Sequence, residues 1–253
     1  MGAPEACRVE VGTLAVITIP GRYCNTHIIE GARALTLVDV GSRDDIEALR
    51  KAVRAIGKPV SWVIPTHLHF DHVMGLEDAC RVFSARLCLG DVAYACVTSG
   101  RRPRPVQPRC VPHFFSGWLW QGLPLLARRD LSLVGRVGSP LGRNELRCPM
   151  GPALSDGQPL PKFEGWTVLA TPGHAEEAIC LVHEAAGFLV SGDTVLNFRG
   201  GEWNPLVTDE DDYHKTRERL RRLRVRAIFP GHGRNLLGED LLPHIRFAER
   251  RCS

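Results

Sequence analysis

The chain of 253 residues lacks the hydrophobic stretches that direct proteins into or across membranes. No run reaches the roughly 18 apolar residues of a membrane span, and the first residues do not join a basic segment to an apolar one of signal-peptide length. We therefore expect a cytoplasmic protein without a membrane partner. With 44% hydrophobic residues the chain can bury a sizeable core, and its length favours one domain over residues 1–253.

Cysteine pairs at disulfide or metal-binding spacing are also missing. The nine cysteines are scattered along the chain, and none forms a CxxC pair. An odd number without a pattern argues against a disulfide framework and against a cysteine-type zinc knuckle. We expect mostly buried, reduced thiols.

A strong excess of charge of one sign is absent as well, since the net charge is only +4. Two basic clusters nevertheless stand out, Arg101-Arg102-Pro103-Arg104 and the six arginines between Arg217 and Arg226. They keep nucleic acid open as an alternative partner. Leu220 and Leu223, however, indicate an ordinary amphipathic helix with a solvated basic face. A small-molecule substrate is therefore preferred and nucleic acid is disfavoured, while the oligomeric state stays open, with a homodimer as one option.

Hydrophobic periodicity predicts an alternation of strands and helices. Strands are predicted at 9–19, 35–38, 60–64, 166–170, 179–183, 188–190 and 227–229, and helices at 44–56, 209–223 and 243–250. The strand at 60–64 ends at Pro65, immediately before a dense group of histidines. Ligands of open α/β sheets usually bind at the carboxyl ends of strands.

The stretch from 100 to 161 differs from the rest of the chain. It holds ten of the 18 prolines and an aromatic patch at 114–120. We interpret it as an irregular, lid-like insertion that covers a pocket. The alternative is a poorly ordered linker between two halves of the chain.

The densest cluster of chemically active side chains is His67-Leu68-His69-Phe70-Asp71-His72. Imidazole and carboxylate groups suit zinc and related divalent ions. Alternate residues of an extended segment point the same way, so His67 and His69 can hold one ion together. Asp71 and His72, slightly further on, can face a second ion.

Three later predicted strands end in polar turns that carry His174, Asp193 and His232. So many ligands exceed the needs of one tetrahedral zinc but suit two ions that share a water. The predicted first site comprises His67, His69 and His174, and the second comprises Asp71, His72 and His232, with Asp193 bridging. The expected cofactors are two divalent ions, zinc in the first place, with iron or manganese as alternatives. Because coordination lowers the pKa of water towards about 7, this arrangement predicts hydrolysis.

The remaining candidates have weaker support. Asp71 and Asp193 are predicted to be catalytic because they would position the attacking hydroxide. Tyr23, Tyr94, Tyr213 and His183 are candidates to contact the oxyanion or the leaving group. As single histidines, His27, His113, His183, His214 and His244 are otherwise interpreted as hydrogen-bonded core or surface residues.

Five segments together resemble the metallo-β-lactamase superfamily, and they occur in the family's order. They are LVDVG at 37–41, THLHFDH at 66–72, TPGH at 171–174, SGD at 191–193 and PGHG at 230–233. The resemblance implies an α/β fold, an αββα sandwich of two mixed sheets flanked by helices, with the site along one edge. It also implies that Asp39 supports the ligand loops by hydrogen bonding.

Departures from the family pattern narrow the choice among the branches of the superfamily. Asp193 as a bridging ligand resembles glyoxalase II, lactonase and ribonuclease Z relatives more than true β-lactamases. His69 stands where flavodiiron proteins carry Glu, which argues against that redox branch. Leu196 replaces the tyrosine usual in acyl-homoserine lactonases, and only about 20 residues follow His232, too few for the C-terminal domain of glyoxalase II. The chain also has no room for the inserted domain of β-CASP nucleases.

We therefore expect a dinuclear metal-dependent hydrolase in which a metal-bridging hydroxide attacks the carbonyl of an ester, thioester or lactone. One alternative is a phosphodiesterase or nuclease of the same superfamily. Another is a mononuclear iron protein similar to persulfide dioxygenases.

Overall fold

A six-stranded mixed sheet forms the first half of the structure. The computed structural model describes residues 6–110 and 125–247. The strands follow the order β1-β2-β3-β4-β5-β6. Their bounds are Cys7–Val11, Leu14–Pro20, Asn25–Glu30, Leu35–Val38, Val60–Ile64 and Arg86–Leu87. Strands β1 to β4 pair antiparallel, whereas β4, β5 and β6 run parallel.

A five-stranded mixed sheet, in the order β13-β12-β9-β8-β7, forms the second half. In chain order, β7, β8, β9, β12 and β13 span Trp166–Ala170, Ile179–His183, Phe188–Gly192, Ala227–Pro230 and Leu236–Leu237. Only β9 and β12 pair in parallel. A small third sheet, which the sequence did not predict, joins β10 (Val195–Leu196), β11 (Glu202–Trp203) and β14 (Arg246–Phe247).

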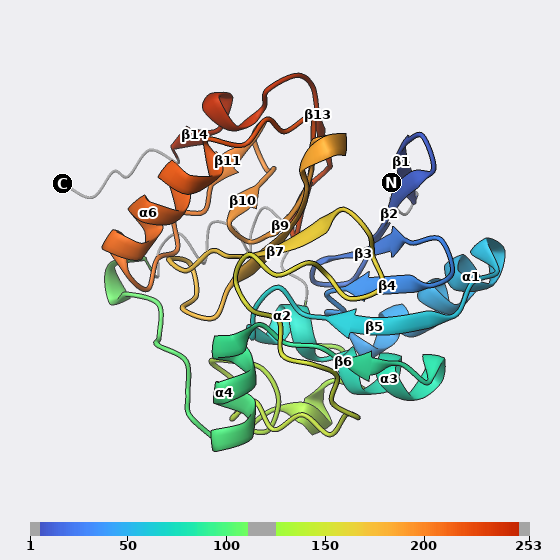
Figure 1. Cartoon of the computed structure of the whole chain (residues 1–253). Coiled ribbons are helices and arrows are strands. Elements are labelled where there is room, and N and C mark those ends of the chain that lie inside the picture. The colour runs from blue at the N-terminus through green and yellow to red at the C-terminus, as the bar shows by residue number, and fades with distance from the viewer. Residues whose placement is uncertain (1–5, 111–124, 248–253) are drawn as a thin grey trace.

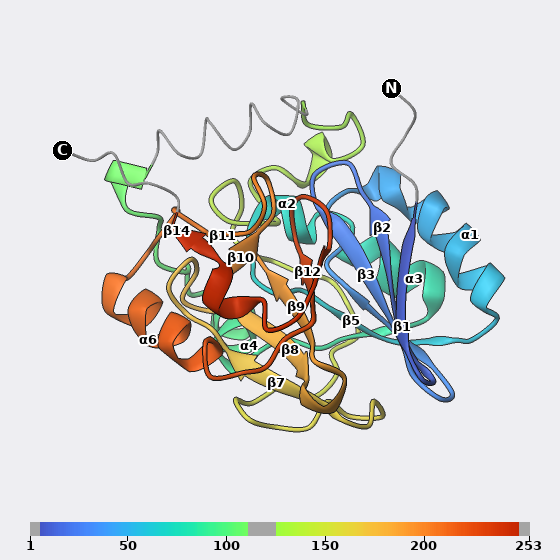
Figure 2. The ribbon, with the colours of Figure 1, turned by 90° about the horizontal axis from the view of Figure 1, so that it is seen from above.

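Helices cover the outer faces of the two large sheets (Figures 1 and 2). The helices are α1 (Ile46–Ile56), α2 (Phe70–Val73), α3 (Leu76–Phe83), α4 (Asp91–Ser99) and α6 (Glu210–Leu220). Seen from above in Figure 2, α1 and α3 lie outside the first sheet and α6 lies outside the second. The expected αββα sandwich is thereby confirmed.

Strand periodicity creates three apolar layers, because successive side chains of a strand point to opposite faces. In β2, Ala15 and Ile17 join the cluster beneath α1 and α3, while Val16 joins the cluster between the sheets. In β8, Leu181 faces inward and Val182 joins the cluster beneath α6.

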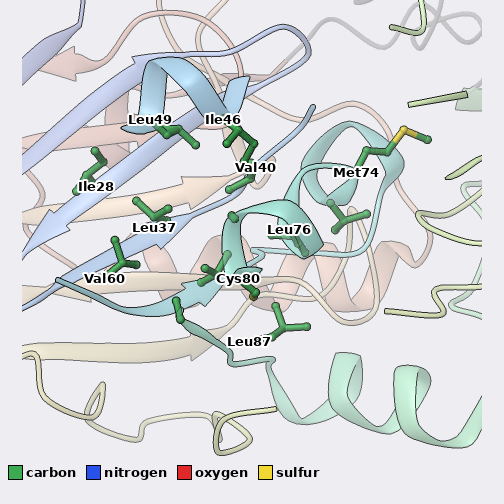
Figure 3. Packing of buried hydrophobic residues seen from close by; sticks show 14 of the residues in the cluster. Ile28, Leu37, Val40, Ile46, Leu49, Val60, Met74, Leu76, Cys80 and Leu87 are labelled. Atoms are coloured by element: carbon green, nitrogen blue, oxygen red, sulfur yellow. The ribbon is translucent and has the colours of Figure 1, made fainter. Parts of the chain in front are cut away.

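The apolar layer on the outer face of the first sheet is covered by α1 and α3 (Figure 3). Leu49 of α1 and Leu76 and Cys80 of α3 lie against Leu37 and Val60 of the sheet. Fully burying a leucine of this kind stabilises a fold by about 1.5–3 kcal/mol. This layer holds β5 in place, and the histidine motif begins just after that strand.

Two predicted elements differ in the structure. The strand expected at 9–19 is a hairpin, because Gly12 takes a left-handed conformation (φ 61°) that turns the chain between β1 and β2. The helix expected at 243–250 is wrong within the described residues. A short 3-10 turn, Leu242–His244, is followed by β14, which pairs with β11. There the ring of Phe247 lies 3.7 Å from the guanidinium of Arg217, a tertiary contact that local periodicity does not contain.

The sequence predicted neither disulfide bonds nor membrane-spanning helices, and the structure bears on both only within the described residues. Eight of the nine cysteines lie within them, all as free thiols, six of them buried. Within the same ranges, every helix is too short or too polar to cross a membrane.

Part of the predicted insertion lies in the described residues. Its irregular chain carries the 3-10 turns Pro108–Cys110 and Leu131–Leu133 and forms isolated bridges to His69, Leu87 and Gly90. His113 and the aromatic patch at 114–120 lie outside the described residues, so a lid role stays a prediction.

Candidate metal centre

The seven predicted ligand residues lie together just beyond the carboxyl ends of four strands. His67 and His69 follow β5 on an extended segment, and Asp71 and His72 belong to the short helix α2. The other three follow the second sheet: His174 after β7, Asp193 after β9 and His232 after β12. All are buried except His69 and Asp71, which are half-buried.

The first group of ligand atoms comes from three histidines. Nε2 of His67 lies 3.0 Å from Nδ1 of His69, and Nε2 of His174 lies 3.1 Å from the same Nδ1. These three nitrogens converge as the sequence predicted for the first site. His69 faces the group with Nδ1, whereas His67 and His174 face it with Nε2.

The second group joins Asp71, His72 and His232. Nε2 of His72 lies 3.3 Å from Nε2 of His232, which lies 3.4 Å from Oδ2 of Asp71. A third, overlapping group contains His67, His72 and Asp193 and connects the two.

Asp193 lies between the groups. Its Oδ1 is 3.3 Å from Nε2 of His72 and 3.4 Å from Nε2 of His232, whereas its Oδ2 is 3.7 Å from Nε2 of His174. Oδ1 is buried and has no hydrogen-bond partner within the described chain. A divalent cation in each group would satisfy this oxygen and the convergent ring nitrogens, so the donor set fits two metal ions.

Hydrogen bonds on the far side of the rings orient two of the first-group histidines. Nδ1 of His67 lies 3.1 Å from Oγ1 of Thr66, and Nδ1 of His174 lies 2.9 Å from the carbonyl oxygen of Leu206. With Nδ1 occupied in this way, Nε2 is left to face the site.

Asp39 lies beneath the histidine motif, where the resemblance implied a supporting carboxylate. It accepts hydrogen bonds from the backbone N–H of Thr66 at 2.7 Å and from its hydroxyl, and its Oδ2 is 3.0 Å from Nδ1 of His72. Its backbone is left-handed (φ 58°), which is costly for a residue with a Cβ. The fold therefore holds Asp39 against its intrinsic preference, in contact with the ligand loop.

Burial disfavours the charged form of the first-group histidines. Burial lowers the pKa of His67 well below its ordinary value, and it lowers that of His69 to about 3 and that of His174 as well. Neutral imidazoles are the form that binds a cation.

Carboxylates favour the protonated form of the second-group histidines. Burial disfavours imidazolium, but Asp193 and Asp71 raise the pKa of His232 to about 9, and the neighbours Cys24, Asp193 and Asp39 raise that of His72. In return, burial would raise the pKa of Asp193, but His232 and His72 hold it well below its ordinary value. Metal binding therefore competes with protonation of these two imidazoles.

The four candidates for contact with the oxyanion or the leaving group have different surroundings in the structure. His183 lies at the far end of β8 from the ligands, where it pairs with Trp166 and accepts a hydrogen bond from the N–H of Ala186. The hydroxyl of Tyr23 donates to Asp130 at 3.0 Å and accepts from the N–H of Ala127, so it serves the fold. For Tyr94, on α4, and Tyr213, buried on α6, substrate contact stays a prediction.

Three of the remaining histidines fit the interpretation as core or surface residues. His27 is buried and lies 3.0 Å from both Thr18 Oγ1 and the carbonyl oxygen of Pro230. His214 is exposed beside Glu210 at 3.9 Å, and His244 is exposed.

Glu177 is a site-supporting residue that the sequence analysis missed. It is buried, and its Oε1 accepts a hydrogen bond of 3.0 Å from the backbone N–H of Leu68, between His67 and His69. Burial raises its pKa. The only signal in the sequence was an acidic pair shortly after His174.

We predict that Glu177→Ala weakens the binding of one metal ion about 10-fold, the size of effect found for groups that orient metal ligands. Competition with a chromophoric chelator measures the two affinities. Glu177→Gln should restore the affinity, because its amide oxygen can still accept from Leu68. Glu176→Ala removes the neighbouring carboxylate, which pairs with Arg101 at 2.6 Å, and serves as the matched control. Equal losses in the Glu177→Ala and Glu176→Ala variants would contradict this role.

The described part of the insertion also supports the motif. The N–H of Ser139 donates to the carbonyl oxygen of Leu68 at 2.8 Å, and the N–H of Phe70 donates to the carbonyl oxygen of Ser139 at 2.9 Å. Gly138 lies so close to the backbone of Phe70 that a Cβ would clash. This strand-like contact holds residues 68–70, which include the ligand residue His69.

Comparisons with known proteins identify the family of the chain. A sequence model of the metallo-beta-lactamase superfamily matches residues 19–95 and 153–232, more than half of the chain. The probable metallo-hydrolase YqjP of Bacillus subtilis is 28% identical over 243 residues, which cover 89% of this chain and 72% of YqjP. The atrochrysone carboxyl ACP thioesterase of Aspergillus fumigatus is 34% identical over 235 residues, which cover 91% of this chain but only 56% of that enzyme.

A solved structure shares the fold. TTHA1623, determined in a di-iron-bound form, superimposes with a TM-score of 0.54 at 23% identity, covering 91% of this chain and 94% of TTHA1623. At this identity the likeness concerns the fold alone.

Proposed function

Because the chain belongs to the metallo-beta-lactamase superfamily, we propose that it is a dinuclear metal-dependent hydrolase that cleaves thioesters or related carboxylic esters. The observation that carries the proposal is the position of Asp193, with Oδ1 3.3 Å from Nε2 of His72 and Oδ2 3.7 Å from Nε2 of His174. A carboxylate with one oxygen towards each histidine group is what a bridging ligand requires.

Two bound ions would supply a water of lowered pKa and polarise the carbonyl oxygen under attack. The chain's own residues set the geometry. Asp193 is 8% exposed and has little freedom to move, so it fixes the spacing of the two groups. Asp71 is half-buried, and its Oδ2 is 3.4 Å from Nε2 of His232, which suits it to orient the attacking water.

The choice of a thioester or ester carbonyl rests on sequence similarity. The chain resembles a protein named as an acyl-carrier-protein thioesterase at 34% identity, although it spans only 56% of that protein. Lactones contain the same reactive carbonyl and stay within the proposal. We propose zinc as the metal, because the three histidine nitrogens of the first group suit it well, with iron as the alternative that imidazole ligands also bind.

Nucleic-acid cleavage is less well supported, because several arginines of the basic clusters face carboxylates. Arg101 lies 2.6 Å from Glu176, and Arg104 lies 3.2 Å from Asp209. In the second cluster, Arg219 donates to Asp156 at 2.8 Å. A backbone-binding surface needs cations that are available to phosphates.

A panel of substrates tests the proposal. Protein loaded with zinc, and separately with iron, is assayed against acyl thioesters, aryl esters, lactones, phosphodiesters and a β-lactam. We expect the thioesters and esters to be cleaved with the highest kcat/KM. Preferential cleavage of phosphodiesters would overturn the proposed substrate class.

A further inference from the structure

A tight turn at 197–201 is attached directly to the loop that carries His232. The N–H of Asn197 donates to the carbonyl oxygen of His232 at 3.1 Å, and its side-chain amide donates to the carbonyl oxygen of Arg234 at 2.7 Å. Gly233 lies against the backbone of Asn197 so closely that a Cβ would clash. The turn and the ligand loop therefore form one unit.

Side chains hold the turn in a single shape. The two carboxylate oxygens of Glu202 accept from the backbone N–H groups of Phe198 at 3.0 Å and Arg199 at 3.2 Å. The side-chain oxygen of Asn197 accepts from the N–H of Gly200 at 3.1 Å. Three hydrogen bonds to consecutive N–H groups leave the backbone of Phe198 little freedom.

The turn presents the ring of Phe198 over a ligand residue. The phenyl and the imidazole of His232 are stacked, with centroids 6.0 Å apart and planes 24° apart. Phe198 is only half-buried, so its ring is not part of the hydrophobic core.

We propose that Phe198 is a specificity-determining residue that contacts the apolar acyl part of the substrate beside the reacting carbonyl. The substrate class is then an acyl thioester or ester with a long aliphatic or aromatic acyl group, in preference to an acetyl group. This inference rests on the proposed function. Ligand pockets typically combine apolar walls with a few polar groups that fix orientation, and here the ligand cluster is the polar part.

Aryl esters and thioesters of one leaving group, with acyl chains from acetyl to decanoyl, test this inference in the zinc-loaded full chain. For Phe198→Ala we expect kcat/KM to fall about 10- to 50-fold for decanoyl, mainly through KM, and less than about 3-fold for acetyl. Phe198→Leu retains an apolar side chain and should lose less. Leu237→Ala, at an exposed position (60%) on β13, is the matched control.

Metal content and thermal unfolding of each variant separate the outcomes. Equal losses for acetyl and decanoyl at unchanged metal content would overturn the inference alone. Metal loss in both Phe198 variants would also overturn it, because the ring would then serve to position His232. Wild-type protein with two ions bound that cleaves none of the acyl esters would overturn the proposed function, and the inference with it.

Discussion

Replacement of Asp193 by asparagine is expected to lower kcat/KM by at least about 10³-fold and to reduce the bound metal from two ions to one or none per chain. The reason is that the two oxygens of its carboxylate face different groups of ligands. Oδ1 is within 3.4 Å of two imidazole nitrogens of the second group, and Oδ2 approaches the first group at 3.7 Å. An amide keeps the shape but offers one weak oxygen donor and no charge, so it cannot bridge two cations.

Elemental analysis and the ester panel, applied to the same preparations, measure the two effects. Asp211→Asn removes a carboxylate from an exposed position on α6 and is the matched control, with wild-type metal and activity expected. Far-UV circular dichroism checks that the fold persists. Two tightly bound ions and full activity in Asp193→Asn would show that the two groups do not share this residue.

Replacement of Gly231 by alanine is expected to damage the site nearly as much, although glycine offers no ligand atom. A Cβ at this position would lie 2.5 Å from Oδ1 of Asp193 and 2.7 Å from Cε1 of His72. Both neighbours are buried and held by several contacts, so a ligand group must shift. Because displacements of about 1 Å can cost 10²-fold in rate, we expect a loss of about that size together with weaker metal binding.

Gly238→Ala is the control for this substitution. A Cβ there would meet only the flexible end of Leu241, with Cδ2 at 2.9 Å, and we expect wild-type activity and metal content. The assay follows kcat/KM and metal content in parallel for both variants. Unchanged activity and metal in Gly231→Ala would mean that the second group is looser than the distances indicate.

Much of the candidate site was predictable because its ligands are concentrated in short motifs after predicted strands. His67, His69 and His72 lie within six residues, and the apolar run at 60–64, which ends at Pro65, identified the strand before them. A parallel strand delivers its carboxyl end to the edge of the sheet, so a motif placed there has few other locations. The predicted partners from the second half, His174 and His232, converge with this motif in the structure.

The failures arose where distant residues decide local structure. Residues 242–247 begin with a helical turn, but pairing of Phe247 with Trp203 extends the chain. Glu177 carries no motif of its own, and its importance depends on Leu68, which is 109 positions away in the chain. Phe198 is one of nine phenylalanines, and only its contact with His232 distinguishes it.

The sequence by itself determined which side chains are available to bind metal and at which strand ends they stand, because residue type and strand periodicity are local properties. Only the tertiary structure decided which atoms face one another: Nδ1 rather than Nε2 of His69, and one oxygen of Asp193 towards each group. Those choices depend on close packing between the two sheets. Gly231, for example, leaves just the space that Asp193 and His72 occupy.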